Sequence, residues 1–160
     1  MAKEKELIKI LQAIPWFQKL SDEHFKKISK ISSIKMLSTN EVLFKQGDSE
    51  KSLYILIEGR IGLDIYGPVK GYIRVYTAEP MDVVGWSSAT PVIRQRTASA
   101  TAVLDSRLIA IDAVKLNQLC EEDHHLGYIV MRRLANVVAA RLMISRLQTL
   151  DLFAHPAEES

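Results

Sequence analysis

The side chains whose types could do chemistry are few, and their spacing limits what they can do. The histidines are His24, His124, His125 and His155, and the single cysteine is Cys120. Small β-barrel enzymes bind metal through histidines on strands, but all four histidines lie outside the region predicted to form strands. His124 and His125 are adjacent rather than one helical turn apart, so they do not face one metal ion. We therefore expect no metal site.

Nucleophilic catalysis is the second chemistry to consider. The tripeptide Gly85-Trp86-Ser87 matches the first part of a Gly-x-Ser-x-Gly turn, but the second glycine is missing. No phosphate-binding Gly-Lys-Thr loop is present either. A single cysteine cannot form an internal disulfide or hold an iron–sulfur cluster alone, so Cys120 is interpreted as a small buried residue in a helix. We expect no catalytic residues and no enzyme activity.

Length, composition and charge indicate one globular domain. The chain has 160 residues, of which 48% are hydrophobic and 25% charged, and its net charge of +2 comes from interspersed rather than clustered charges. Four of the first six residues are charged, and the apolar residues after them are interrupted by Lys9, Gln12 and Pro15. A secretory signal and a membrane span are therefore not predicted, and the protein is expected to be cytoplasmic.

Periodicity predicts a single domain of residues 1–153. Two short helices should come first, then strands separated by regular turn residues, then one short and one long helix. The long helix is predicted because the last part of the domain lacks proline and has a single glycine, Gly127. The predicted parts are residues 1–33 for the N-terminal helices, 34–111 for a β-roll with a helical turn at 87–89, 112–153 for the C-terminal helices, and 154–160 for a tail.

Residues 42–63 are the most informative stretch of the sequence. Between Gly47 and Gly59, apolar and β-branched residues alternate with others, which predicts a short, half-buried strand. Together with Gly85 and the segment Arg96-Thr97-Ala98, this spacing resembles the cyclic-nucleotide-binding domain of the Crp and Fnr type regulators. The resemblance implies a mainly β fold with flanking helices: a double-stranded β-helix (jelly-roll-like β-roll) with N-terminal helices and a long C-terminal dimerisation helix. It also implies a ligand-sensing function.

The resemblance places a phosphate-binding cassette between residues 82 and 102. In the family a Gly-Glu turn opens a short helix, and an Arg followed by Ser or Thr begins the next strand. A guanidinium and the backbone N–H groups at a helix N-terminus together suit the single negative charge of a cyclic phosphodiester. The residues implied to bind a cyclic nucleotide or another small anionic ligand are Gly85, Trp86, Ser87, Ser88, Ala89, Arg96, Thr97 and, from the long helix, Ser145.

Trp86 departs from the family pattern, because cyclic-AMP binders have at this position a glutamate that accepts a hydrogen bond from the ribose 2′-hydroxyl. An indole has one donor and no acceptor. The lost bond is worth about 1.5 to 3 kcal/mol, so cyclic AMP is expected to bind weakly. Trp86 could stack on a different ligand or fill the pocket as part of the core. Next to Ser145, the cation of Arg146 replaces a small hydroxyl of the family and is interpreted as facing solvent.

The long helix, predicted over residues 123–152, has two apolar stripes rather than one. The stripe that contains Leu134 and Leu142 is predicted to cover the open side of the β-roll. A second stripe at heptad spacing then needs another partner, and a two-fold dimer with a second copy would bury it. The predicted dimer-interface residues are Leu126, Val130, Val137, Ala140, Ile144 and Leu147. The alternative is that both stripes pack within one subunit.

In the transcription factors of this family, a winged helix-turn-helix follows the long helix. Only residues 151–160 follow here, so no direct DNA binding is expected unless the chain is part of a longer product. The sequence predicts a non-catalytic homodimer that senses a small anionic ligand and relays its occupancy to an unknown protein partner, without a membrane. The alternative is a degenerate domain that binds no nucleotide and serves as a dimeric protein-interaction scaffold.

Overall fold

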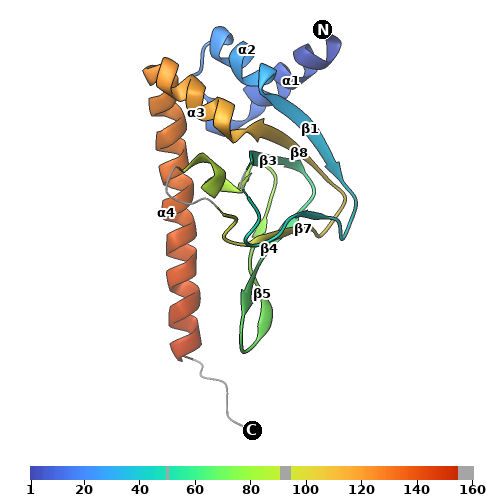
Figure 1. Cartoon of the computed structure of the whole chain (residues 1–160), viewed down its shortest axis with the longest axis vertical. Helices are drawn as coiled ribbons and strands as arrows, with labels where there is room; N and C mark the ends of the chain where they lie inside the picture. Colours follow the sequence, from blue (N-terminus) through green and yellow to red (C-terminus); the bar gives the residue numbers. More distant parts are fainter. Residues whose placement is uncertain (50, 91–94, 155–160) are drawn as a thin grey trace.

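The computed structural model describes residues 1–49, 51–90 and 95–154, which form a β-roll with helices at one end and along one side (Figure 1). The helices are α1 (Ala2–Ala13), α2 (Asp22–Lys30), α3 (Ala113–Glu122) and α4 (His124–Ala154), with the 3₁₀ turns η1 (Pro15–Phe17) and η2 (Trp86–Ala89). The strands are β1 (Ser32–Leu37), β2 (Val42–Phe44), β3 (Ser52–Glu58), β4 (Ile61–Gly67), β5 (Gly71–Ala78), β6 (Val83–Val84), β7 (Ser99–Ala102) and β8 (Ser106–Asp112).

The strands of the described residues form two antiparallel four-stranded sheets, in the orders β1-β8-β3-β6 and β2-β7-β4-β5. Apolar side chains from both sheets meet between them, including Phe44, Leu56, Leu63 and Leu108. β4 pairs with both β5 and β7, so the start of β7 lies beside the β4–β5 hairpin. The predicted β-roll with N-terminal helices and a long C-terminal helix is confirmed.

Strand β3 packs against apolar clusters on both faces. Leu53 and Ile55 point to a core cluster that they share with Leu11 and Phe17 from the N-terminal segment. On the opposite face of the sheet, Leu56 belongs to the cluster between the two sheets. The sequence predicted a half-buried strand, and β3 follows that pattern over residues 52–55, where partly buried and buried residues alternate. Leu56 departs from it, because the second sheet covers that face.

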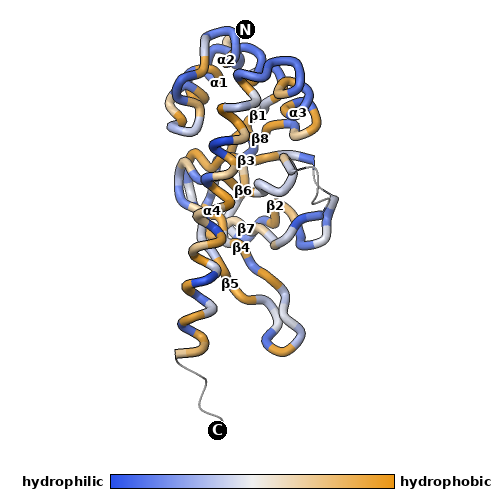
Figure 2. The backbone as a smooth tube through the Cα atoms, turned by 90° about the vertical axis from the view of Figure 1, so that its left-hand side faces the viewer, coloured by the Kyte–Doolittle hydropathy of each residue, from blue (hydrophilic) through white to orange (hydrophobic). Residues whose placement is uncertain are grey.

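Helix α4 has 31 residues and runs along one side of the roll, past the β4–β5 hairpin (Figure 1). At about 1.5 Å per residue it is about 46 Å long. Its first half is anchored in the core through Leu126, Val130 and Leu134. Apolar residues recur along its second half, which lies outside that core (Figure 2). Within the described residues, no helix has both the length and the apolarity needed to cross a bilayer.

The buried histidine and the partly buried cysteine both take part in packing the helices. His24 Nε2 lies 2.7 Å from Asp123 Oδ2, which links α2 to the start of α4, and Asp123 Oδ1 accepts from Leu126 N at 3.1 Å. Cys120 is partly buried in α3, against the core. Burial, and then the charges of Glu121 and Asp123, raise the pKa of its thiol to about 11. In the described parts of the chain, no three His, Cys, Asp or Glu side chains group to hold a metal ion.

Candidate ligand site

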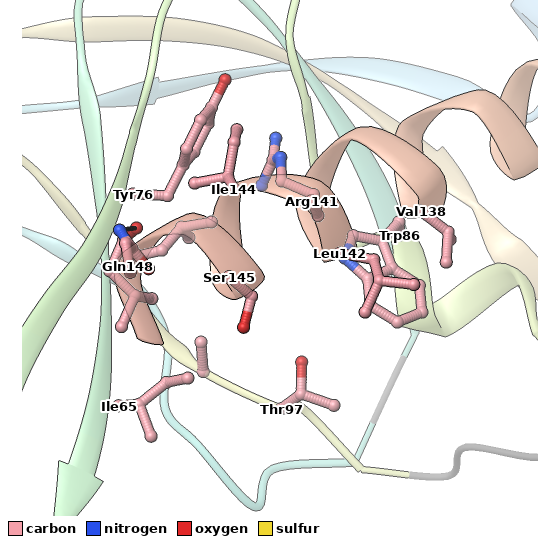
Figure 3. A pocket seen from close by; sticks show the side chains of 13 residues that line it. Ile65, Tyr76, Trp86, Thr97, Val138, Arg141, Leu142, Ile144, Ser145 and Gln148 are labelled. Atoms are coloured by element: carbon pink, nitrogen blue, oxygen red, sulfur yellow. Dashed lines mark hydrogen bonds between the residues drawn. The ribbon is translucent and has the colours of Figure 1, made fainter. Parts of the chain in front are cut away.

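A cavity of about 360 Å³ lies between the β-roll and the second half of α4 (Figure 3). β4 and β5 form one wall, η2 and the segment before β7 form a second, and α4 closes the third side. The lining residues are Leu63, Ile65, Val75, Tyr76, Trp86, Thr97, Ala98, Val138, Arg141, Leu142, Ile144, Ser145 and Gln148. Most of them are apolar, and none is acidic.

The α4 wall of the cavity has three polar side chains on one helical face. Arg141, Ser145 and Gln148 are four and three residues apart, so they share that face. Arg141 Nη2 donates to the main-chain carbonyl of Val83 at 2.9 Å, and Gln148 Nε2 donates to that of Val75 at 2.8 Å. These two hydrogen bonds connect α4 to β6 and β5, so the position of the helix depends on them.

Arg141 is the partly buried cation of the cavity wall. Its guanidinium carbon lies 3.8 Å from the centre of the Tyr76 ring. Burial lowers the pKa of Arg141, and the nearby Tyr76 and Asp82 oppose this change. The Tyr76 hydroxyl donates to Asp82 Oδ2 at 2.7 Å; burial and this bond raise the pKa of Tyr76. None of the ion pairs found among the described residues includes Arg141.

Two hydroxyls and an indole complete the cavity. Thr97 and Ser145 point their hydroxyls toward one another from opposite walls, whereas Trp86 lies at one end beside Val138 and Leu142 (Figure 3). Trp86 is partly buried and also packs against the core cluster shared by the helices. Its ring therefore forms part of the wall and leaves the cavity open next to it.

Arg96, which the resemblance implies as a ligand-binding residue, does not line the cavity. Its side chain is 4% exposed. Nη1 donates to the main-chain carbonyl of Gly85 at 3.1 Å and Nη2 to that of Ser52 at 2.7 Å. The guanidinium carbon lies 4.1 Å from the centre of the Phe44 ring. Arg96 therefore connects η2, β3 and the interior of the roll, and packing directs it inward.

Gly85 has the left-handed backbone conformation that lets the Arg96 guanidinium approach it closely. Its φ of 75° is in the left-handed region, which favours glycine. A Cβ atom at this position would also collide with the Arg96 guanidinium. The family-like Gly and Arg of this cassette are thus matched to each other in space.

The short turn η2 also contributes less to the cavity than predicted. Ser87 and Ala89 are buried, and the Ser88 hydroxyl donates to the Gly85 carbonyl at 2.8 Å. Of the predicted ligand residues, Trp86, Thr97 and Ser145 line the cavity, whereas Gly85, Ser87, Ser88, Ala89 and Arg96 do not. The brief helical turn itself forms as expected, as residues Trp86–Ala89.

Sequence reasoning missed Tyr76, Arg141 and Gln148. A signal for two of them was present, because Arg141 and Gln148 lie three residues after Val138 and Ser145, on the stripe predicted to face the roll. Tyr76 had no such signal, since neighbouring residues of the strand are also aromatic or β-branched. Arg146, interpreted as solvent-facing, is exposed.

The predicted dimer stripe begins in the core of the subunit and reaches the surface only in its second half. Leu126 and Val130 are 0% exposed inside the subunit, so their assignment to a dimer interface is corrected: they are core residues. Heptad spacing identifies a stripe but does not show where along the helix the stripe leaves the core. Val137 and Ile144 are partly buried, and only Ala140 and Leu147 of the predicted set are exposed.

The β-roll, the long helix across it and the cavity between them define the class of this protein. The sequence of residues 34–123, more than half of the chain, matches the profile of the cyclic nucleotide-binding domain. The chain belongs to that family, in its Crp and Fnr regulator type. The comparison with curated protein sequences gave no match.

Solved structures agree with this assignment. A protein of Geobacter metallireducens GS-15 assigned to cyclic nucleotide binding is 29% identical, with a TM-score of 0.73 over 89% of this chain and 98% of that one. The catabolite activator protein of Thermus thermophilus is 25% identical, with a TM-score of 0.69 over 88% of this chain and 63% of that one. A cyclic nucleotide-binding domain of Methylobacillus flagellatus KT shares the fold at 22% identity, with a TM-score of 0.77 over 92% and 83% of the two chains.

Proposed function

We propose that this chain is a non-catalytic regulatory domain that senses a small ligand in the cavity between the β-roll and α4. The cavity itself is the observation that carries the proposal, because its largely apolar walls hold two hydroxyls, of Thr97 and Ser145, that point inward. A ligand there would contact α4 next to the hydrogen bonds of Arg141 and Gln148. Occupancy would favour one position of α4 over another, and the helix would relay that change to a partner.

Cyclic AMP is a poor match to this cavity. A ribose 2′-hydroxyl needs an acceptor, and Trp86 has none. No carboxylate occurs among the described lining residues, and Arg96 is held by the main chain of Gly85 and Ser52. A cyclic phosphate would therefore lack both its usual cation and the partner of its sugar.

We expect cyclic AMP to bind this protein about tenfold to a hundredfold more weakly than it binds a site with the carboxylate at position 86, because a charge-assisted hydrogen bond is absent. Calorimetry with millimolar nucleotide measures this directly. A dissociation constant of about 1 µM or tighter would contradict the prediction and would mean that another group replaces the acceptor.

The sensing proposal can be tested by NMR through the indole resonances of the protein's two tryptophans. The indole N–H resonance of Trp86 should shift when a small organic fragment enters the cavity, whereas that of Trp16, buried in the helical core, should not. Ser145→Phe should abolish the shift by filling the cavity. Thr149→Phe makes the same kind of change at an exposed residue that does not line the cavity.

The outcome separates the sensor from the scaffold. Fragments that shift the Trp86 resonance in the Thr149→Phe variant, but not in the Ser145→Phe variant, support the sensor. If no member of a broad fragment library shifts the Trp86 resonance of the wild type, the sensing proposal fails. The protein would then be interpreted as a degenerate, dimeric interaction scaffold.

A two-fold homodimer is the second part of the proposal, and the exposed face of α4 supports it. Met143, Leu147 and Leu150 are 62%, 60% and 64% exposed, and with Ala140 they lie three and four residues apart. Such a stripe is typical of a helix that packs against another helix. A second copy of α4 would bury it, and a change in the position of α4 would then reach the partner subunit.

A further inference from the structure

The one charged side chain among the described lining residues directs its guanidinium away from the hydroxyls of the cavity. Arg141 Nη2 donates to the Val83 carbonyl at 2.9 Å, and the guanidinium carbon lies 3.8 Å from the centre of the Tyr76 ring. Figure 3 shows this guanidinium on the Tyr76 side of α4, away from the Ser145 hydroxyl. No acidic side chain occurs among the described lining residues. An ionic ligand would therefore give up part of its hydration without gaining a counter-ion.

The main polar groups left for a ligand are two neutral hydroxyls, because the Tyr76 hydroxyl and the Gln148 amide already donate within the protein. Thr97 and Ser145 point their hydroxyls toward one another from opposite walls (Figure 3). Neither hydroxyl forms a hydrogen bond within the described parts of the chain. A hydroxyl can both donate and accept. A ligand group that also does both, such as an amide or a hydroxyl, can therefore satisfy the two residues together.

The rest of the cavity wall is apolar and partly open to solvent. Eight of the thirteen lining residues are apolar, and Ile65 and Leu142 among them are 39% and 52% exposed. A ligand that covers this surface removes apolar area from water, which favours binding in proportion to the area. Trp86 lies beside Val138 and Leu142 at one end, and its indole offers a flat ring a matching surface. A volume of about 360 Å³ suits a molecule of one or two rings.

We infer that the cavity binds a small, flat, uncharged molecule whose one polar group both donates and accepts hydrogen bonds. Its ring lies against Trp86 and Leu142, and its polar group lies between the hydroxyls of Thr97 and Ser145. The inference rests on the proposed sensing function and names its ligand class. Such a ligand differs from a cyclic nucleotide because it has neither a phosphate nor a sugar. It contacts α4 through Leu142 and Ser145, on the side of the helix that lines the cavity.

The first test compares three probes of one shape that differ in charge: neutral 2-naphthamide, the anion 2-naphthoate and the cation 2-naphthamidine. Calorimetry, with the Trp86 indole resonance as a second readout, should show that the amide binds about tenfold or more tightly than either ion, because the ions find no counter-charge. Benzamide lacks the second ring and covers less apolar surface, so it should bind about tenfold more weakly than 2-naphthamide.

Ser145→Ala separates the role of the hydroxyl from that of the apolar walls. It should weaken 2-naphthamide about fivefold, because one hydrogen bond is lost, and leave the binding of naphthalene unchanged, because naphthalene has no polar group. Thr149→Ala also removes a hydroxyl from α4, at an exposed residue that does not line the cavity, and it should affect neither probe.

Each contrary outcome has a separate meaning. If either ion binds as tightly as the amide, the cavity does not select against charge, and the inference is overturned while the sensing proposal stands. If Ser145→Ala leaves 2-naphthamide unchanged, or weakens naphthalene equally, the hydroxyl does not recognise the ligand and the inference is again overturned. If none of the probes binds although other fragments shift the Trp86 resonance, the inference fails alone. If no fragment shifts it, the sensing proposal fails as well.

Discussion

Replacing Arg96 by alanine is expected to lower the free energy of unfolding by about 3 kcal/mol, because the change removes a buried cation and leaves two main-chain carbonyls without their donors. The carbonyls belong to Gly85 and Ser52, and the stacking on Phe44 is lost as well. Urea unfolding measures the change. For a protein of this size, each kcal/mol also lowers the thermal midpoint by about 2 to 4 °C.

A matched control for this experiment is Arg146→Ala, since Arg146 is exposed and hydrogen-bonds to none of the residues that Arg96 contacts. Its effect should remain within about 0.5 kcal/mol. Equal stability of the two variants would show that Arg96 is dispensable for the fold. Arg96 would then be a stronger candidate for a residue that binds the ligand.

Leu147→Glu is expected to convert the proposed dimer to monomer. In a two-fold interface the substitution places two carboxylates in an apolar contact, where a charge without a partner is costly. We expect the dimer dissociation constant to rise at least about a hundredfold, or about 2.7 kcal/mol. Sedimentation at micromolar concentration measures the change.

Met36→Glu is the control for the dimer experiment, because Met36 is 67% exposed on β1, away from α4. It should leave the dimer unchanged. A wild-type protein that sediments as a monomer at micromolar concentration would refute the dimer and leave the stripe of Ala140, Met143, Leu147 and Leu150 to a different partner. Val137 would be a poorer test site, since it is partly buried against the subunit core.

The sequence predicted the elements well because local patterns determine them. The β-roll could be predicted from the glycines at its turns and the alternation in its strands. The absence of proline from the last part of the chain was sufficient to predict α4. Three cavity residues, Trp86, Thr97 and Ser145, were also predicted, since the family resemblance fixes their register. A strand's burial on the second face, as in β3, depends on what packs there, and spacing along the chain does not contain that information.

The direction of arginine side chains could not be predicted. Arg96 and Arg141 are both compatible with a site, and the packing around each decides which one reaches the cavity. Gly85 and Phe44 leave room for the Arg96 guanidinium inside the roll, whereas Tyr76 holds that of Arg141 at the cavity wall. The dimer stripe raises a similar difficulty, because Leu126 and Leu147 share a heptad pattern but only Leu147 lies beyond the core.

The raised pKa of Cys120 determines how this protein can be labelled. With a pKa of about 11, roughly one thiol in ten thousand is ionised at pH 7, and the thiolate is the form that reacts with alkylating reagents. A second cysteine at an exposed α4 position outside the proposed dimer stripe, such as Ala135, would have a pKa of about 8.5 and would react roughly a hundredfold faster or more. Spin labels could therefore be attached to α4 with the native cysteine in place, and the separation of two α4 helices could be followed as a ligand is added.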